Sequence, residues 1–284
     1  MKPAPFSYVK PDSLGEVFEL LGTHGDAAAI LAGGQSLVAT LNFRLSSPAV
    51  LVDINGLDEL KGISVADGRL RIGALTRHSE VERSREVAEH APLIADAIGH
   101  VAHPAIRNRG TFGGSIALAD PAAELPACVR ALDGRIEITG AKGKRSVAAS
   151  DFFRGVYETD LGPGELVTAV EVPVIAPGYR SAFAELARRR GDYAMVGLAV
   201  HGRAEDGVVS DVRLVFFGIG ATPVSATTAA AALEGRRLDA AAESDVRDAL
   251  GEDLDPFDGI DCSGATKLHL ARELAARTLK EFAA

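Results

Sequence analysis

The sequence predicts an α+β protein with two domains, and three features lead to this expectation. Its 284 residues correspond to about two domains at roughly 150 residues each. Up to about residue 175, short apolar runs alternate with helical stretches and are interrupted by two glycine pairs. Three strand-like runs then follow one another without a helix between them, and helical patterns complete the chain.

The first region is expected to form a small lobe over residues 1–55. Residues 27–31 form a short apolar run, typical of a buried strand, that ends at the glycine pair 33–34. A helical stretch over residues 36–45 follows, with leucines at every fourth position. Residues 50–54 are expected to form the next strand.

A second lobe is expected over residues 56–175. Its predicted strands cover residues 69–72, 135–139 and 165–172, and its predicted helices cover residues 79–90, 92–101 and 122–132. Two prolines and a glycine within residues 173–178 indicate a domain boundary, so the domains are predicted as 1–175 and 176–284.

The second domain is expected to be a small antiparallel sheet with helices. Its predicted strands cover residues 181–188, 195–203 and 208–218, and its predicted helices cover residues 226–233, 240–250 and 265–282. The turn Glu205-Asp-Gly between the last two strands is typical of a hairpin.

Composition argues against several classes of function. With 30 Lys and Arg against 39 Asp and Glu, the net charge of −9 has the wrong sign for a nucleic-acid or anionic-membrane binder. No apolar run reaches the ~18–20 residues that span a bilayer, and the N-terminus lacks the pattern of a secretory signal, so a cytoplasmic location is expected. Two separated cysteines and scattered histidines predict no metal site in this chain.

Two short segments carry the chemical information. We call Ala32-Gly-Gly-Gln-Ser-Leu37 the first glycine segment and Thr111-Phe-Gly-Gly-Ser-Ile-Ala117 the second. Glycine has no Cβ and tolerates positive φ, so backbone N–H groups can turn toward an anion. Either segment alone is also compatible with a plain turn; together they favour a diphosphate site. The GxGxxG and GxxxxGK[ST] motifs are absent, which argues against a Rossmann dehydrogenase or a P-loop enzyme.

These segments, with LADPAAELPA after the second, resemble the FAD-binding medium subunits of the molybdenum hydroxylases, the carbon monoxide dehydrogenase medium subunits in particular. The resemblance covers nearly the whole chain, from Phe6-Ser-Tyr-Val-Lys-Pro to Arg190-Gly-Asp-Tyr-Ala. It implies a two-lobed PCMH-type FAD-binding domain followed by a C-terminal flavoprotein domain.

The resemblance also implies which residues bind FAD. Those expected around the diphosphate are Ala32, Gly33, Gly34, Gln35, Ser36, Leu37, Thr111, Gly113, Gly114 and Ser115. Those expected along the rest of the cofactor are Val101, Ala102, Ile106, Asp120, Leu161 and Tyr193, with Leu161 on the isoalloxazine and Tyr193 beside it. No residue is assigned a certain catalytic role. Asp120 is also compatible with a cap before Pro121, and Tyr193 with a plain core or surface aromatic.

The function that the resemblance implies is electron transfer. FAD in this chain would collect electrons from iron–sulfur clusters and pass them to an external acceptor. The molybdenum cofactor and the [2Fe-2S] clusters are expected only in a large and a small partner subunit, assembled as a dimer of heterotrimers. Two alternatives remain: a self-contained FAD-dependent oxidoreductase of the same fold, and a flavin-free binding protein. The substrate is not indicated.

Overall fold

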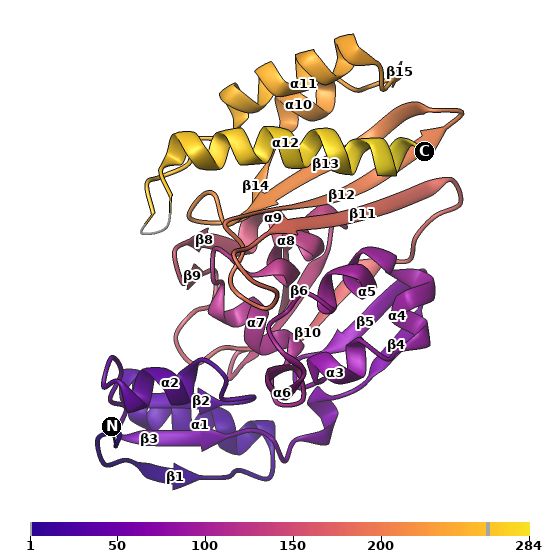
Figure 1. The fold of residues 1–284 in the computed structure, drawn as a ribbon. Coiled ribbons are helices and arrows are strands. Elements are labelled where there is room, and N and C mark those ends of the chain that lie inside the picture. Colours follow the sequence, from indigo (N-terminus) through magenta and orange to yellow (C-terminus); the bar gives the residue numbers. More distant parts are fainter. Residues whose placement is uncertain (1, 260–261) are drawn as a thin grey trace.

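The computed structural model describes residues 2–259 and 262–284 and confirms the α+β class. Figure 1 shows an N-terminal lobe at the bottom, a middle lobe, and a C-terminal sheet with its helices at the top. No helix in the described ranges combines the length and the apolar character needed to cross a membrane.

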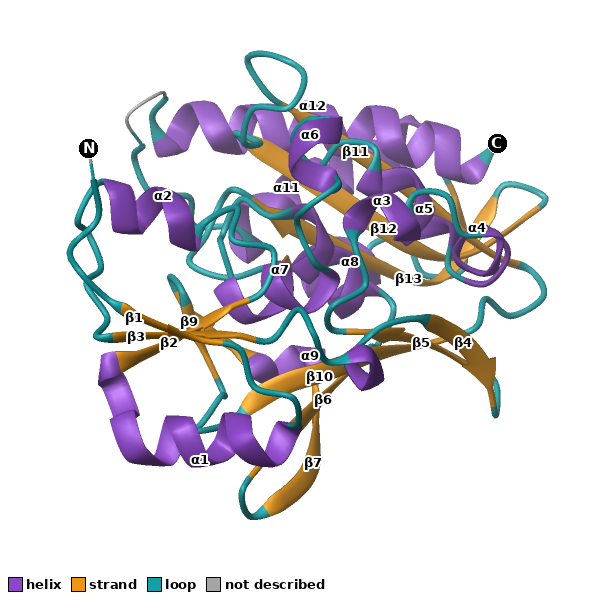
Figure 2. Cartoon of the chain, turned by 90° about the horizontal axis from the view of Figure 1, so that it is seen from below, coloured by secondary structure: helices purple, strands orange, loops and turns teal. Residues whose placement is uncertain are grey.

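The N-terminal lobe is a three-stranded parallel sheet with a helix on each face (Figure 2). In spatial order the strands are β1 (Ser7–Val9), β3 (Val50–Asp53) and β2 (Ala28–Leu31). The helices are α1 (Leu14–His24) and α2 (Leu37–Asn42), and a 3-10 turn, η1 (Gly25–Ala27), follows α1.

Two expectations for this lobe need correction. We assigned no element to residues 14–24, where the structure has α1; Ser13 caps this helix by accepting a hydrogen bond from Glu16 N, and Val17 on its inner face is fully buried. The helix predicted over residues 36–45 ends at Asn42, and Leu45 is 79% exposed. The pattern of a leucine at every fourth position therefore continues past the end of the helix.

The middle lobe is built on a five-stranded antiparallel sheet. Its spatial order is β4 (Ile63–Ala66), β5 (Arg69–Gly73), β10 (Leu166–Pro173), β6 (Arg135–Gly140) and β7 (Gly143–Ala148). A helical layer packs on its apolar face: α3 (His78–Val81), α4 (Arg85–His90), α5 (Pro92–Ile98), α6 (Pro104–Arg107), α7 (Phe112–Leu118), α8 (Glu124–Ala131) and α9 (Ala149–Phe152). Shorter elements complete it: η2 (Asp58–Leu60), β8 (Phe153–Gly155) and β9 (Glu158–Thr159).

The single helix predicted over residues 79–90 is two helices, α3 and α4. Ser84 separates them because it has an extended backbone and its hydroxyl accepts a hydrogen bond from Val87 N, which begins α4 anew. This break leaves α3 as a short element beside the second glycine segment.

The C-terminal sheet is antiparallel, as predicted. Its strands are β11 (Tyr179–Leu186), β12 (Val196–Glu205), β13 (Val208–Phe217) and β14 (Val224–Ser225), with β15 (Arg236–Arg237) paired to β13. The helices that follow are α10 (Thr227–Ala231), α11 (Ala240–Asp253) and α12 (Gly264–Ala283). Helix α12 packs on one face of the sheet, and α5 and α8 of the middle lobe pack on the other. The sheet thus shares a core with the middle lobe, through Ala199, Val215 and Phe217.

Candidate functional site

The first glycine segment is an open loop between β2 and α2. Its carbonyl groups already have donors inside the chain: Asn55 Nδ2 lies 2.8 Å from the Ala32 oxygen, and Gln35 Nε2 lies 3.1 Å from the Gly33 oxygen. By contrast, the backbone N–H groups of residues 33–37 have no acceptor in the described part of the chain. The loop therefore presents a run of hydrogen-bond donors without competing acceptors, as an anion site requires.

The two glycines of this segment have different reasons to be glycine. Gly34 has φ +73°, the left-handed region that favours glycine. Gly33 lies against the backbone that precedes the second segment: a Cβ at Gly33 would be 2.4 Å from the Arg109 carbonyl oxygen and 2.9 Å from Gly110 Cα. The two glycine segments, 80 residues apart in sequence, are thus adjacent across the two lobes.

The second glycine segment is not the open turn that we predicted but the first turn of α7. Thr111 caps the helix, and its hydroxyl accepts a hydrogen bond from Gly114 N at 3.3 Å. The N–H groups of Phe112 and Gly113 donate to Thr76 and Ala74 carbonyls, both at 2.9 Å. The N–H groups that we expected to face a ligand therefore already have partners. The hydrogen-bonding groups that this segment can offer a ligand are therefore its hydroxyl groups.

Gly113 is required by packing. A Cβ at this position would lie 2.4 Å from Ala74 Cβ and 2.6 Å from Ala74 Cα. Because α7 must approach the end of β5 this closely, Gly113 reflects contact between a helix and a strand. In the first pair, Gly34 reflects a turn with positive φ, and Gly33 reflects contact with the backbone before the second segment.

His78, on α3, lies directly behind the second segment and was not predicted. Its ring is 3% exposed; Nε2 is 3.0 Å from the Thr111 carbonyl oxygen and 3.0 Å from Ser115 Oγ, while Nδ1 is buried without a partner. Burial lowers the pKa of His78 to about 4, against the hydrogen bond to the Thr111 oxygen, so the ring is neutral near pH 7. Ser115 therefore turns toward this buried ring.

The segment that contains Val101, Ala102 and Ile106 is half-buried and lies next to the second glycine segment in the chain. Ala102 has φ +45°, and Arg107 holds this turn by donating to the carbonyls of Val101 and Ala102 at 3.0 and 3.2 Å. Arg107 is itself buried and forms a two-point ion pair with Glu82 at 2.9 Å.

The loop that carries Tyr193 reaches this same place from the C-terminal domain. A Cβ at Gly191 would lie 2.5 Å from His103 Cε1 and 3.0 Å from the Ala102 carbonyl oxygen. Tyr193 is 70% exposed, so it is not a core residue. Partial burial and the negative charges of Asp120 and Glu124 raise the pKa of Tyr193, which places those carboxyl groups nearby.

Asp120 is buried and has two partners in the chain. Its Oδ1 accepts from Ala122 N at 2.9 Å, which forms a turn around Pro121 and not a helix cap, since Ala123 is the N-cap of α8; its Oδ2 accepts from Tyr157 OH at 3.2 Å. Tyr157, at the tip of the β8–β9 hairpin, was not predicted and carries no sequence motif. Burial of the Tyr157 hydroxyl, together with the charge of Asp120 beside it, raises the pKa of Tyr157 to about 12. Leu161, just after β9, is half-buried against the middle-lobe core.

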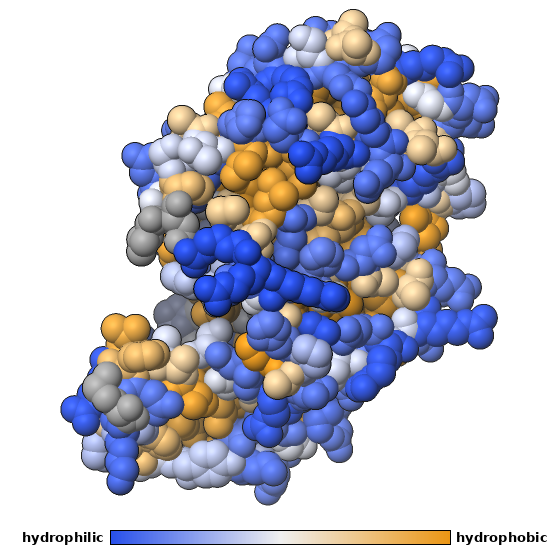
Figure 3. All heavy atoms as spheres, in the orientation of Figure 1, coloured by the Kyte–Doolittle hydropathy of each residue, from blue (hydrophilic) through white to orange (hydrophobic). Residues whose placement is uncertain are grey.

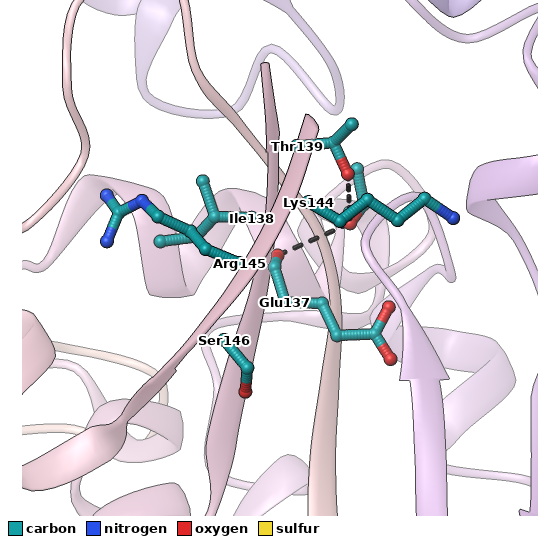
Figure 4. Close-up of a pocket in the computed structure, with 7 residues that line it drawn as sticks. Glu137, Ile138, Thr139, Lys144, Arg145 and Ser146 are labelled. Carbon is teal, nitrogen blue, oxygen red and sulfur yellow. Dashed lines mark hydrogen bonds between the residues drawn. The ribbon is translucent and has the colours of Figure 1, made fainter. Parts of the chain in front are cut away.

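Figure 3 shows the surface hollowed between the N-terminal lobe, at the lower left, and the rest of the molecule. A different concavity of about 280 Å³ lies on the outer, polar face of the middle sheet (Figure 4). There Lys144 and Arg145 point in opposite directions from β7, Arg145 is paired with Asp160 and Glu165, and Glu137 is paired with Arg71. This concavity contains none of the predicted FAD-binding residues.

The arrangement fits FAD, because the first glycine segment offers unpaired donors suited to a diphosphate, and Tyr193 supplies an exposed aromatic ring on the loop that packs against Ala102 and His103. Which residues contact the cofactor stays a prediction.

Comparison with known proteins extends over both domains. A family model described as the FAD binding domain in molybdopterin dehydrogenase matches residues 4–175. A second, the CO dehydrogenase flavoprotein C-terminal domain, matches residues 181–282.

Similar proteins cover the whole chain. The 6-hydroxypseudooxynicotine dehydrogenase complex subunit alpha of Paenarthrobacter nicotinovorans is 39% identical over 98% of this chain and 95% of its own length. Caffeine dehydrogenase subunit beta of a Pseudomonas species is 36% identical over 100% of this chain and 96% of its own length. Among solved structures, a carbon monoxide dehydrogenase from Hydrogenophaga pseudoflava superposes with a TM-score of 0.96 at 35% identity, covering 99% of this chain and 98% of that one. The chain therefore belongs to the family of FAD-binding flavoprotein subunits of the molybdenum-containing dehydrogenases, as the resemblance in its sequence predicted.

Proposed function

We propose that this chain holds FAD between the first glycine segment and α7 and serves as the electron-transferring medium subunit of a molybdenum hydroxylase complex. The observation that carries the proposal is the run of unpaired N–H groups over residues 33–37, in a loop whose carbonyls are turned to Asn55 and Gln35. When bound, FAD supplies the ability to take up and release electrons singly or in pairs.

The residues of the chain would bind and orient the cofactor. Donors of residues 33–37 would neutralise the diphosphate, with the Thr111 hydroxyl on the opposite side. Asp120, fixed by Ala122 N and Tyr157, would accept from cofactor hydroxyls, and Tyr193 with Leu161 would flank the ring. Among these groups we assign no general acid–base pair, in keeping with a role in electron transfer.

The expected partners are a large subunit with the molybdenum cofactor and a small subunit with [2Fe-2S] clusters, in a cytoplasmic dimer of heterotrimers. Related proteins support an assembly, because they include a subunit of a dehydrogenase complex and the medium chain of a carbon monoxide dehydrogenase. Their substrates range from caffeine to carbon monoxide, so similarity in this chain does not specify the substrate. We also retain the proposed domain boundary near residue 175.

The decisive experiment is to tag the chain, purify it from its native host, and measure flavin, molybdenum and iron in the main complex. FAD with both metals and two further chains supports the proposal. A lone, yellow, metal-free protein would favour the self-contained FAD-dependent oxidoreductase, and a colourless one the flavin-free binding protein.

The position of the ring is tested by Tyr193→Ala. Because this side chain is mostly exposed, its removal should change the free energy of unfolding by no more than about 0.5 kcal/mol. The visible spectrum or the reduction rate of bound flavin should change. A variant altered only in stability would remove Tyr193 from the site.

A further inference from the structure

We propose that Arg77 is a positioning residue that fixes the two lobes of the FAD site relative to each other. This inference rests on the proposed function, since it assumes that FAD binds between the lobes. Arg77 immediately precedes α3 and belongs to neither glycine segment.

On the side of the N-terminal lobe, Arg77 acts through Asn55. Its Nη2 donates to Asn55 Oδ1 at 2.6 Å. The amide nitrogen of Asn55 then donates to the Ala32 carbonyl at 2.8 Å and to Asp53 Oδ1 at 2.6 Å. Because Arg77 determines which way the Asn55 amide faces, it also keeps the Ala32 carbonyl turned away from the donor run of the first glycine segment.

On the side of the middle lobe, the same guanidinium holds the backbone just before the second segment. Its Nη1 donates to the Arg109 carbonyl. That carbonyl is the atom against which Gly33 packs, since a Cβ at Gly33 would lie 2.4 Å from it. One side chain therefore controls both the orientation of the first segment and the surface on which that segment rests.

The bridge has no substitute nearby. Within residues 2–175, the Arg77–Asn55 contact is the one side-chain hydrogen bond between the N-terminal lobe, through residue 55, and the middle lobe. The backbone of Arg77 is also fixed, because its N–H donates to Glu80 Oε2 at 2.7 Å. A planar guanidinium can reach two acceptors with two different nitrogens, which an ammonium group on a lysine stem does not reproduce.

The first test measures FAD affinity of the full chain after flavin removal and reconstitution. Arg77→Met should raise the Kd for FAD by about 10- to 100-fold, the effect of losing a hydrogen bond made by a charged group. Arg77→Lys should lie within about threefold of Arg77→Met, since it retains charge but not the two-point bridge. Arg85→Met is the matched control, because this arginine, eight residues along the chain, is 92% exposed.

The outcomes separate three possibilities. If Arg77→Lys restores wild-type affinity, charge attraction replaces the bridge and the proposal is overturned. If Arg77→Met binds FAD as the wild type does, the bridge has no role, although the proposed function stands. If neither the wild type nor the Arg85→Met control binds FAD, the proposed function fails, and this inference with it.

A double-mutant cycle tests the bridge itself. Asn55→Ala and Arg77→Met should each weaken FAD binding, and the double variant should be about as weak as the worse single variant, because both changes break the same contact. Thermal unfolding of the flavin-free variants and circular dichroism of the saturated flavin are measured alongside. Additive effects, or a loss of affinity that follows unfolding alone, would contradict a positioning role.

Discussion

Gly33-Gly34 and Gly113-Gly114 lie on opposite sides of the junction between the two lobes, and they use the missing side chain in different ways. The first pair belongs to a loop that leaves the N–H groups of residues 33–37 without acceptors in the described chain. In the second, the N–H groups of residues 112–115 are bonded within the chain, and Gly113 lies against Ala74. A similar glycine signature therefore accompanies a donor cradle in one case and a packing contact in the other.

This difference separates binding from stability. A change in the first segment should act mainly on FAD affinity, because the loop contributes little to the apolar core. In the second segment, a change at Gly113 should act on the fold through α7, whose Phe112 and Ile116 are fully buried, whereas a charge at Gly114 should act on FAD affinity. Four substitutions test this division.

The largest effect on FAD retention is expected from Gly114→Asp. A like charge a few ångström from a phosphate costs about 4 kcal/mol at an effective dielectric constant of ~20, so affinity should fall by roughly 100-fold or more. A Cβ there would lie 2.6 Å from the Thr111 hydroxyl that caps α7, so any loss of stability should be the same for Asp and for an uncharged side chain of similar size. Flavin content after gel filtration measures the result. Gly114→Asn is the matched control without the charge; equal losses in both variants would mean that this segment does not face the diphosphate.

Gly33→Ala should be next. Its Cβ would meet the Arg109 carbonyl at 2.4 Å, and overpacking of this kind typically costs about 1–3 kcal/mol, equivalent to about 5- to 150-fold in Kd if the lobes separate. Fluorescence titration of FAD into the flavin-free chain measures it. Gly22→Ala, on α1 with nothing within 4 Å, is the control and should leave Kd unchanged. An unaltered Kd for Gly33→Ala would show that the close approach of the segments is not needed for binding.

Gly113→Ala should lower stability and leave FAD affinity nearly unchanged, the reverse of the two changes above. Overpacking against Ala74 should lower the free energy of unfolding of the flavin-free chain by about 1–3 kcal/mol. The Kd for FAD, measured where the variant is still folded, should remain within about threefold of wild type. Denaturant unfolding gives the first quantity. A stable variant with lost affinity would mean that Gly113 acts on FAD binding and not on packing.

The smallest effect on FAD affinity is expected at His78, whose main consequence is a pH dependence of stability. Its folded pKa, about 4, is below its usual 6.5, so between these values the unfolded chain binds more protons. The free energy of unfolding should therefore be highest above pH 6.5 and decrease as the pH falls toward 4, by up to about 3 kcal/mol from this residue. His201, whose burial also lowers its pKa to about 4, adds to the same slope.

Denaturant unfolding between pH 4 and 8 tests this assignment. His78→Gln should reduce the slope and, because Thr111 and Ser115 are its partners, weaken FAD binding slightly. His201→Gln, in the C-terminal sheet, should reduce the slope without changing FAD affinity. An unchanged slope in His78→Gln would mean that the ring is not held neutral.

Local sequence patterns determined much of the architecture. Alternation and apolar runs predicted β2, β3, β5, β6 and β10–β13 with small errors at their ends, because burial of one or both faces leaves a direct trace in the chain. Helix α1 was missed, and the break between α3 and α4 was not foreseen, since both depend on serine caps that look like ordinary polar residues.

The sequence by itself also determined the family, because the two glycine segments in this order are specific to it; which residues contact FAD stays a prediction. Only the tertiary structure decided how those residues are held. Arg77, His78 and Tyr157 belong to no motif, and each acts on a residue that is remote in sequence: Asn55, Thr111 and Asp120 respectively. Hydrogen bonds between groups that are distant in sequence depend on distance and direction in space, which periodicity along the chain does not encode.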